Sequence, residues 1–155
     1  MPVNKLSNIV VHCSDSTWGS AAEIRRWHLA KGWKDGGYHF VIENGQVKPD
    51  LYLASIDGDV SVLRELDGDL FVEDNEIGAH ALGYNDKSIG VCMIGKTTFS
   101  APQMGGLIIN LHEMRKRFKI EIPAIVGHYE TEQSGGKTCP NIDMMHVRYL
   151  LGKIT

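Results

Sequence analysis

Residues 88–95, with the sequence SIGVCMIG, form an almost continuous apolar run. Such a run is typical of a central β-strand that is covered on both faces by other parts of the protein. A second apolar run, NIVVHCS at residues 8–14, predicts another buried strand that leads into a loop. Shorter strands are predicted at residues 38–42 (YHFVI) and 124–128 (AIVGH). The rest of the chain must therefore cover a buried sheet.

Two amphipathic helices are predicted between these strands. Ser20 and Glu23 stand in the spacing of a capping box, which predicts a helix over residues 21–31. Ser100 and Pro102 suit the start of a second, longer helix, as an N-cap and a first-turn proline. The apolar stripe of that helix consists of Met104, Leu107, Ile108, Leu111, Met114 and Phe118.

The remaining segments are predicted from turn signals. Asn44-Gly45 predicts a tight hairpin turn after the strand at 38–42. Residues 46–76 carry two Asp-Gly turns between short alternating runs, which predict a β excursion or a hairpin with an acidic loop. Asn141 is expected to cap a last helix of about ten residues. Helices and strands thus alternate through residues 1–155 without a linker or repeat, which predicts a single α/β domain.

Composition excludes several classes of function. The net charge is −3 and no basic run stands out, which argues against affinity for bulk nucleic acid or an anionic membrane. No stretch approaches the roughly 20 apolar residues of a membrane span. The N-terminus lacks the apolar core of a secretory signal, so we expect synthesis and folding in a cytoplasm. There, the three cysteines are expected to be free thiols or metal ligands.

A metal site can be built from residues at the predicted strand ends. His12 and His128 each lie where a strand runs out into a loop, and Cys139 follows in the loop after the second of these strands. Two imidazoles and a thiolate form a three-ligand zinc set with a fourth position open, as in catalytic sites. The spacing matches no short metal motif, and a core histidine held by hydrogen bonds is the alternative. Cys13 competes as a ligand, but strand alternation turns it away from His12 and predicts, as for Cys92, a core position.

Three blocks of sequence carry a resemblance to a known family. They are IRRWHLAKGWKDGGYHFVI at 24–42, GAHALGYNDKSIGVCMIG at 78–95, and GHYE followed by KTCP within 127–140. Together they resemble the zinc-dependent N-acetylmuramoyl-L-alanine amidases, which include phage amidase-lysozymes, wall-recycling amidases and peptidoglycan recognition proteins. The likeness extends from about residue 8 to residue 150 and is closest to the small phage lysozymes.

The resemblance implies a specific site and fold. It implies that His12, His128 and Cys139 bind one catalytic zinc ion, that Tyr38 is the catalytic tyrosine, and that Lys137 is the catalytic lysine. The implied fold is a central mixed β-sheet flanked by helices. The implied substrate is peptidoglycan, cut at the amide bond between N-acetylmuramic acid and L-alanine.

Other residues take weaker assignments from the same blocks. His80 matches a histidine in the substrate cleft of the phage enzymes, and Asn85 is a further candidate for substrate binding. His39 points away from Tyr38 and is expected to be structural. Residues 46–76 depart from the family because they are longer and acidic. Surface or packing positions are expected for His28, His112 and His146.

The implied biological role is that of a phage or prophage endolysin. Such an enzyme waits in the host cytoplasm until a separate protein permeabilises the membrane. A cytosolic wall-recycling amidase is one alternative, but those enzymes tend to carry aspartate where this chain has Cys139. A non-catalytic relative that binds peptidoglycan or a phage RNA polymerase is another alternative, and the presence of Tyr38, Lys137 and Cys139 together argues against it. A monomer is expected.

Overall fold

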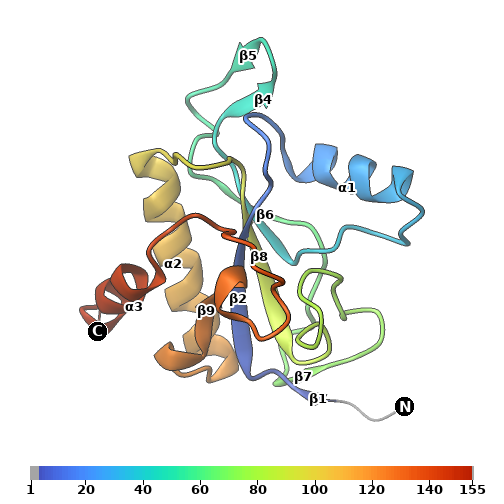
Figure 1. The fold of residues 1–155 in the computed structure, drawn as a ribbon, viewed down its shortest axis with the longest axis vertical. Coiled ribbons are helices and arrows are strands. Elements are labelled where there is room, and N and C mark those ends of the chain that lie inside the picture. The colour runs from blue at the N-terminus through green and yellow to red at the C-terminus, as the bar shows by residue number, and fades with distance from the viewer. Residues whose placement is uncertain (1–3, 155) are drawn as a thin grey trace.

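A five-stranded mixed β-sheet lies at the centre of the computed structural model, which describes residues 4–154 (Figure 1). The strand order is β6-β3-β8-β2-β9. The inner pairs are parallel, and β6 runs antiparallel to β3 at one edge. The mixed sheet implied by the resemblance is therefore confirmed. The strands span Asn8–Cys13 (β2), Phe40–Ile42 (β3), Val60–Val62 (β6), Ser88–Met93 (β8) and Ile125–Gly127 (β9).

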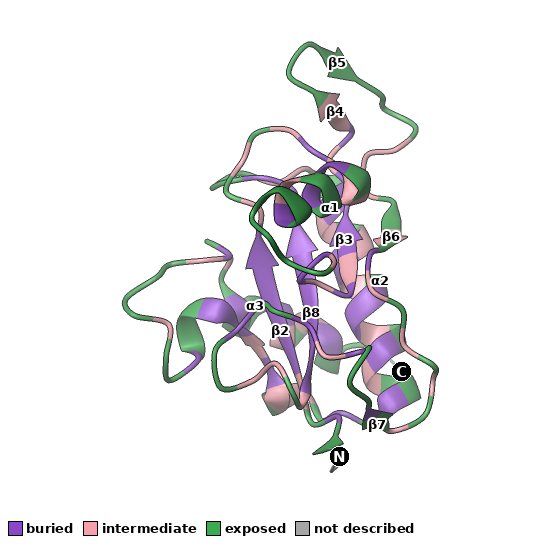
Figure 2. Cartoon of the chain, turned by 90° about the vertical axis from the view of Figure 1, so that its right-hand side faces the viewer, coloured by how far each residue is buried: buried purple, intermediate pink, exposed green. Residues whose placement is uncertain are grey.

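The two strands predicted to be buried form the middle of this sheet. β2 and β8 pair in parallel over six residues, from Asn8 opposite Ser88 to Cys13 opposite Met93. Every residue of β8 is buried, as are five of the six in β2 (Figure 2). The continuous apolar runs arise because neither face of these strands meets solvent.

Helices cover both faces of the sheet (Figure 1). A large apolar cluster joins α2 and α3 to one face and includes Leu111, Phe118 and Val147. A smaller cluster lies on the face covered by α1, where Ile24 packs near Cys92. The core position predicted for Cys92 is confirmed. The helices span Ala21–Ala30 (α1), Ala101–Phe118 (α2) and Met144–Gly152 (α3), with short 3-10 turns at Ile122–Ala124 (η1) and His128–Glu130 (η2).

The predicted caps of the first two helices are confirmed. The Ser20 hydroxyl accepts the N–H of Glu23 at 3.1 Å, and the Ser100 hydroxyl accepts the N–H of Gln103 at 3.1 Å. Each bond satisfies one of the backbone donors that a helix start leaves without an intrahelical partner. No helix within residues 4–154 has the length and apolarity needed to cross a bilayer.

The predicted start of the last helix is wrong. The N-cap of α3 is Asp143, whose Oδ1 accepts the N–H groups of Met145 and His146. Asn141 adopts a left-handed conformation with φ of 61°. Its amide donates instead to the carbonyl of Lys96 at 2.8 Å. Asparagine and aspartate both suit an N-cap and a left-handed backbone conformation. The sequence therefore does not show which of Asn141 and Asp143 is the cap.

The segment over residues 46–76 is a β excursion, as predicted. The prediction of a tight hairpin turn at Asn44-Gly45 is wrong. β3 pairs with β6, and the projecting hairpin is formed by β4 and β5. The Asn44 side chain accepts the N–H of Gln46 at 2.9 Å, so the chain bends away from β3 instead of folding back along it. The short strands span Asn4–Lys5 (β1), Gln46–Lys48 (β4), Leu51–Tyr52 (β5) and Phe71–Val72 (β7), with β1 antiparallel to β7.

Candidate active site

A cavity of about 570 Å³ opens where β2 and β9 end. It lies at the carboxyl edge of parallel strands, where α/β proteins commonly bind ligands. Six of the seven predicted site residues line it: His12, Tyr38, His80, His128, Lys137 and Cys139.

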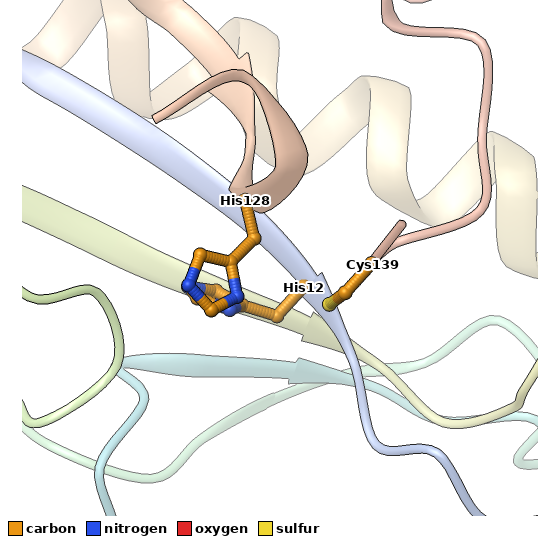
Figure 3. A group of neighbouring side chains, drawn as sticks. All are labelled: His12, His128 and Cys139. Atoms are coloured by element: carbon orange, nitrogen blue, oxygen red, sulfur yellow. The ribbon is translucent and has the colours of Figure 1, made fainter. Parts of the chain in front are cut away.

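The parallel register of β2 and β9 brings the two histidines together. Val11 pairs with Gly127, so His12 and His128 follow at the same level of the sheet edge. Their ring centroids are 4.6 Å apart. One potential ligand atom from each histidine and the Cys139 sulfur all lie within 4.8 Å of one another (Figure 3). This group could hold a metal ion.

Cys139 is tied to the end of β2. The N–H of Cys13 donates to the Cys139 sulfur at 3.0 Å, and the carbonyl of Cys139 accepts the N–H of Tyr129 at 2.8 Å. Cys13 is buried, as predicted, although it also borders the cavity. Cys13 does not belong to the group of potential metal ligands formed by His12, His128 and Cys139. The contact between the two thiols lowers the pKa of Cys13 to about 7 and raises that of Cys139.

The histidines of the cavity are neutral at pH 7. Burial lowers the pKa of His12, and the neighbouring His80, His128 and Lys137 lower it further. Burial and Lys137 lower the pKa of His128 in the same direction. Burial, helped by His39, lowers the pKa of His80 to about 3. Neutral imidazole is the form that binds a metal ion.

Tyr38 and Lys137 bring a hydroxyl and an ammonium group to the same cavity. The ring centroid of Tyr38 is 5.1 Å from that of His12. Burial raises the pKa of Tyr38, and the neighbouring cysteines raise it further, so its hydroxyl keeps its proton at neutral pH. Lys137 is exposed on the loop that precedes Cys139. Both side chains can therefore donate hydrogen bonds to a bound substrate.

His80 and Asn85 have partners inside the protein. The Nδ1 of His80 lies 2.9 Å from the Nε2 of His12. The side-chain oxygen of Asn85 accepts the N–H groups of His80 and Ala81, at 2.7 and 2.9 Å, and Asn85 does not line the cavity. Substrate binding stays a prediction for both residues, and the geometry of Asn85 favours a role in holding the loop.

Of the remaining histidines, His39 and His28 have structural contacts, His112 is half-buried and His146 is exposed. His39 is buried, with its Nδ1 accepting the N–H of Gly90 and its Nε2 bonded to the carbonyl of Glu76. Its structural role is confirmed. His28 packs beneath Trp33 at a centroid distance of 4.5 Å. Trp33 itself lines the cavity and was missed, although it stands within the block at 24–42.

The chain is similar to phage endolysins over most of its length. It is 32% identical to the endolysin of Enterobacteria phage K11 over 149 residues, which cover 89% of this chain and 82% of that protein. It is 32% identical to the endolysin of Escherichia phage T7 over 147 residues, which cover 88% of this chain and 81% of that protein.

Solved structures share the fold. The N-acetylmuramoyl-L-alanine amidase LysC from Clostridium intestinale superposes with a TM-score of 0.73 at 21% identity, covering 98% of this chain and 91% of that one. Drosophila PGRP-LB superposes with a TM-score of 0.63 at 23% identity, covering 90% and 79%. A family model described as N-acetylmuramoyl-L-alanine amidase matches residues 2–142. With this match over most of its length, the chain belongs to the N-acetylmuramoyl-L-alanine amidase family.

Proposed function

We propose that this protein is a zinc-dependent endolysin that hydrolyses the amide bond between N-acetylmuramic acid and L-alanine in peptidoglycan. Family membership and the similarity to phage endolysins support the reaction and the role. The observation that carries the proposal is the convergence of His12, His128 and Cys139 beside Tyr38 and Lys137 in one cavity.

The chemistry of the donor set supports zinc. Zinc–nitrogen bonds of about 2.0–2.1 Å and zinc–sulfur bonds of about 2.3 Å place tetrahedral ligand atoms about 3.4–3.6 Å apart. The three ligand atoms here lie within 4.8 Å of one another, so small side-chain adjustments bring them into that range. A cation also stabilises a thiolate, which offsets the raised pKa of Cys139. When bound, zinc supplies Lewis acidity and an activated water molecule.

The protein side chains would complete the reaction. The Lys137 ammonium would stabilise negative charge that develops on the substrate oxygen. Removing one such donor typically costs about 100- to 1,000-fold in rate. The protonated hydroxyl of Tyr38 would donate a hydrogen bond to the same region of the substrate. His12 and His128 would stay neutral as ligands, because burial disfavours their charged forms.

Mass spectrometry of digested peptidoglycan tests the reaction. The purified protein should release stem peptides with a free N-terminal L-alanine and leave the glycan strands intact. Lys137→Ala should release far less peptide, whereas Lys116→Ala, which removes an exposed lysine of α2, should match the wild type. Products cut between sugars, or between amino acids of the stem, would refute the proposed reaction. A polymerase contact and the monomeric state stay predictions from the resemblance.

A further inference from the structure

A buried hydrogen-bond chain leads from His12 into the sheet. The Nε2 of His12 lies 2.9 Å from the Nδ1 of His80. The Nε2 of His80 lies 3.2 Å from the hydroxyl of Ser88. That hydroxyl lies 2.6 Å from the backbone carbonyl oxygen of Tyr84. The chain thus ends on a group that can only accept a hydrogen bond.

This carbonyl sets the direction of every bond in the chain. Ser88 has one hydroxyl proton, and an oxygen–oxygen distance of 2.6 Å requires that proton to lie between Ser88 and Tyr84. The Ser88 oxygen must then accept the N–H at Nε2 of His80. Neutral His80 carries a single ring proton, so its Nδ1 is an acceptor.

His12 must therefore donate from its Nε2, which leaves its Nδ1 without a proton. The reverse direction requires Ser88 to donate to His80. The oxygens of Ser88 and Tyr84 would then face each other at 2.6 Å without a hydrogen between them. Only the first direction gives each close contact a proton, and it presents the Nδ1 of His12 as a metal ligand.

The side chains of this hydrogen-bond chain are buried, although His12 and His80 also border the cavity. Ser88 and His12 are 0% and 1% exposed, and His80 is 9% exposed. Ser88 does not line the cavity, so water is poorly placed to replace its hydroxyl. The ring of His80 lies over Gly90, where an added Cβ would meet its Cγ at 2.7 Å. Asn85 fixes the backbone of the same loop by accepting the N–H of His80 at 2.7 Å.

We propose that Ser88 and His80 are positioning residues that hold His12 in the tautomer and orientation required to bind zinc. This inference rests on the proposed function, because it assigns a purpose to the unprotonated Nδ1 of His12. Residues that orient a metal-bound histidine typically contribute about 10- to 100-fold to metal affinity. Neither residue needs to touch the substrate for this role.

Two variants with a rescue test the inference through zinc affinity. Ser88→Ala and His80→Leu should each raise the zinc dissociation constant by about 10- to 100-fold in a competition assay with a chelating indicator. His80→Asn keeps an acceptor near the position of Nδ1 and should recover most of the affinity. Ser61→Ala removes a hydroxyl from the edge strand β6, which is separated from β8 by β3. This control variant should bind zinc as the wild type does.

Nitrogen NMR of the histidine rings supplies a readout that a purely structural role would not change. In the metal-free wild type, His12 should already carry its proton on Nε2, whereas Ser88→Ala should show a mixture of tautomers. A wild-type His12 protonated on Nδ1, or unchanged zinc affinity in both Ser88→Ala and His80→Leu, would overturn the inference. A wild type that shows the Nε2 proton yet binds no zinc would refute the metal site of the proposed function and leave the hydrogen-bond chain intact.

Discussion

His12, near the end of β2, and His128, directly after the neighbouring parallel strand β9, have ring centroids 4.6 Å apart. They are 116 residues apart in the chain, and the pairing of Val11 with Gly127 brings them level. A site made this way depends on strand register, because a shift of one residue would turn His12 to the other face. The rigid centre of the fold thus places two of the three proposed ligands.

Replacing Lys137 should separate catalysis from metal binding. Lys137→Ala should keep about one zinc ion per chain and lose about 100- to 1,000-fold in rate, because it removes a charge donor and leaves the ligands in place. Metal analysis and peptide release measured on the same preparation check this. Loss of zinc together with activity would show that Lys137 acts on the site's structure.

Removing the hydroxyl of Tyr38 should also lower the rate of peptide release without loss of zinc. Tyr38→Phe keeps the ring that packs 5.1 Å from His12, so the fold and zinc content should not change. The rate of peptide release should fall by about 100-fold or more, since a hydrogen-bond donor is lost from the cavity. Full activity in this variant would make Tyr38 a packing residue.

Two apolar residues of α2 should differ sharply in their effect on stability. Leu111 is fully buried in the core, whereas Ile109 is 58% exposed. Leu111→Ala should lower the free energy of unfolding by about 2–5 kcal/mol, because it leaves a cavity. Ile109→Ala should change it by no more than about 0.5 kcal/mol. Urea denaturation of both variants measures the difference, and equal effects would contradict the packing of α2.

Glu43 should make stability depend on pH. Burial raises the pKa of this carboxyl above its ordinary 4.5, although Ala21 and Ser61 donate hydrogen bonds to it. At pH values below 4.5, the carboxyl is protonated in both the folded and the unfolded state. As the pH rises above 4.5, the unfolded chain releases this proton before the folded protein does. The free energy of unfolding therefore falls until the pH passes the raised pKa of the folded state.

Glu43→Gln removes this titration and keeps a carbonyl oxygen for both donors. The variant should therefore gain stability relative to the wild type between pH 4 and pH 7, as measured by urea denaturation at each pH. A constant difference across that range would show that Glu43 titrates alike in both states.

The parts of the fold that follow from local patterns could be predicted from the sequence. The buried strands show as apolar runs, and the caps at Ser20 and Ser100 show as spacings within one helical turn. The hairpin at Asn44-Gly45 could not be predicted correctly, because the partner of β3 is β6, which lies beyond an inserted hairpin. Which strand pairs with β3 is decided by packing over longer distances.

The candidate site likewise combines residues that local patterns indicate with contacts that depend on long-range packing. Strand ends and the loop after the second strand indicated His12, His128 and Cys139, and the family blocks indicated Tyr38 and Lys137. The partner of His80 could not be found this way, because its contact with His12 depends on the space above Gly90 and on a loop held by Asn85. A polar residue at the start of a buried strand, Ser88, was the available signal for this network.

X-ray absorption at the zinc edge tests the central claim most directly. The wild-type protein should show one sulfur at about 2.3 Å and three nitrogen or oxygen neighbours at about 2.0–2.1 Å. Cys139→Ala should lose both the sulfur signal and most of the zinc, whereas Cys13→Ser should keep both. Retention of the sulfur signal in Cys139→Ala, or a wild-type zinc with no sulfur neighbour, would contradict the assignment of His12, His128 and Cys139 as the ligands.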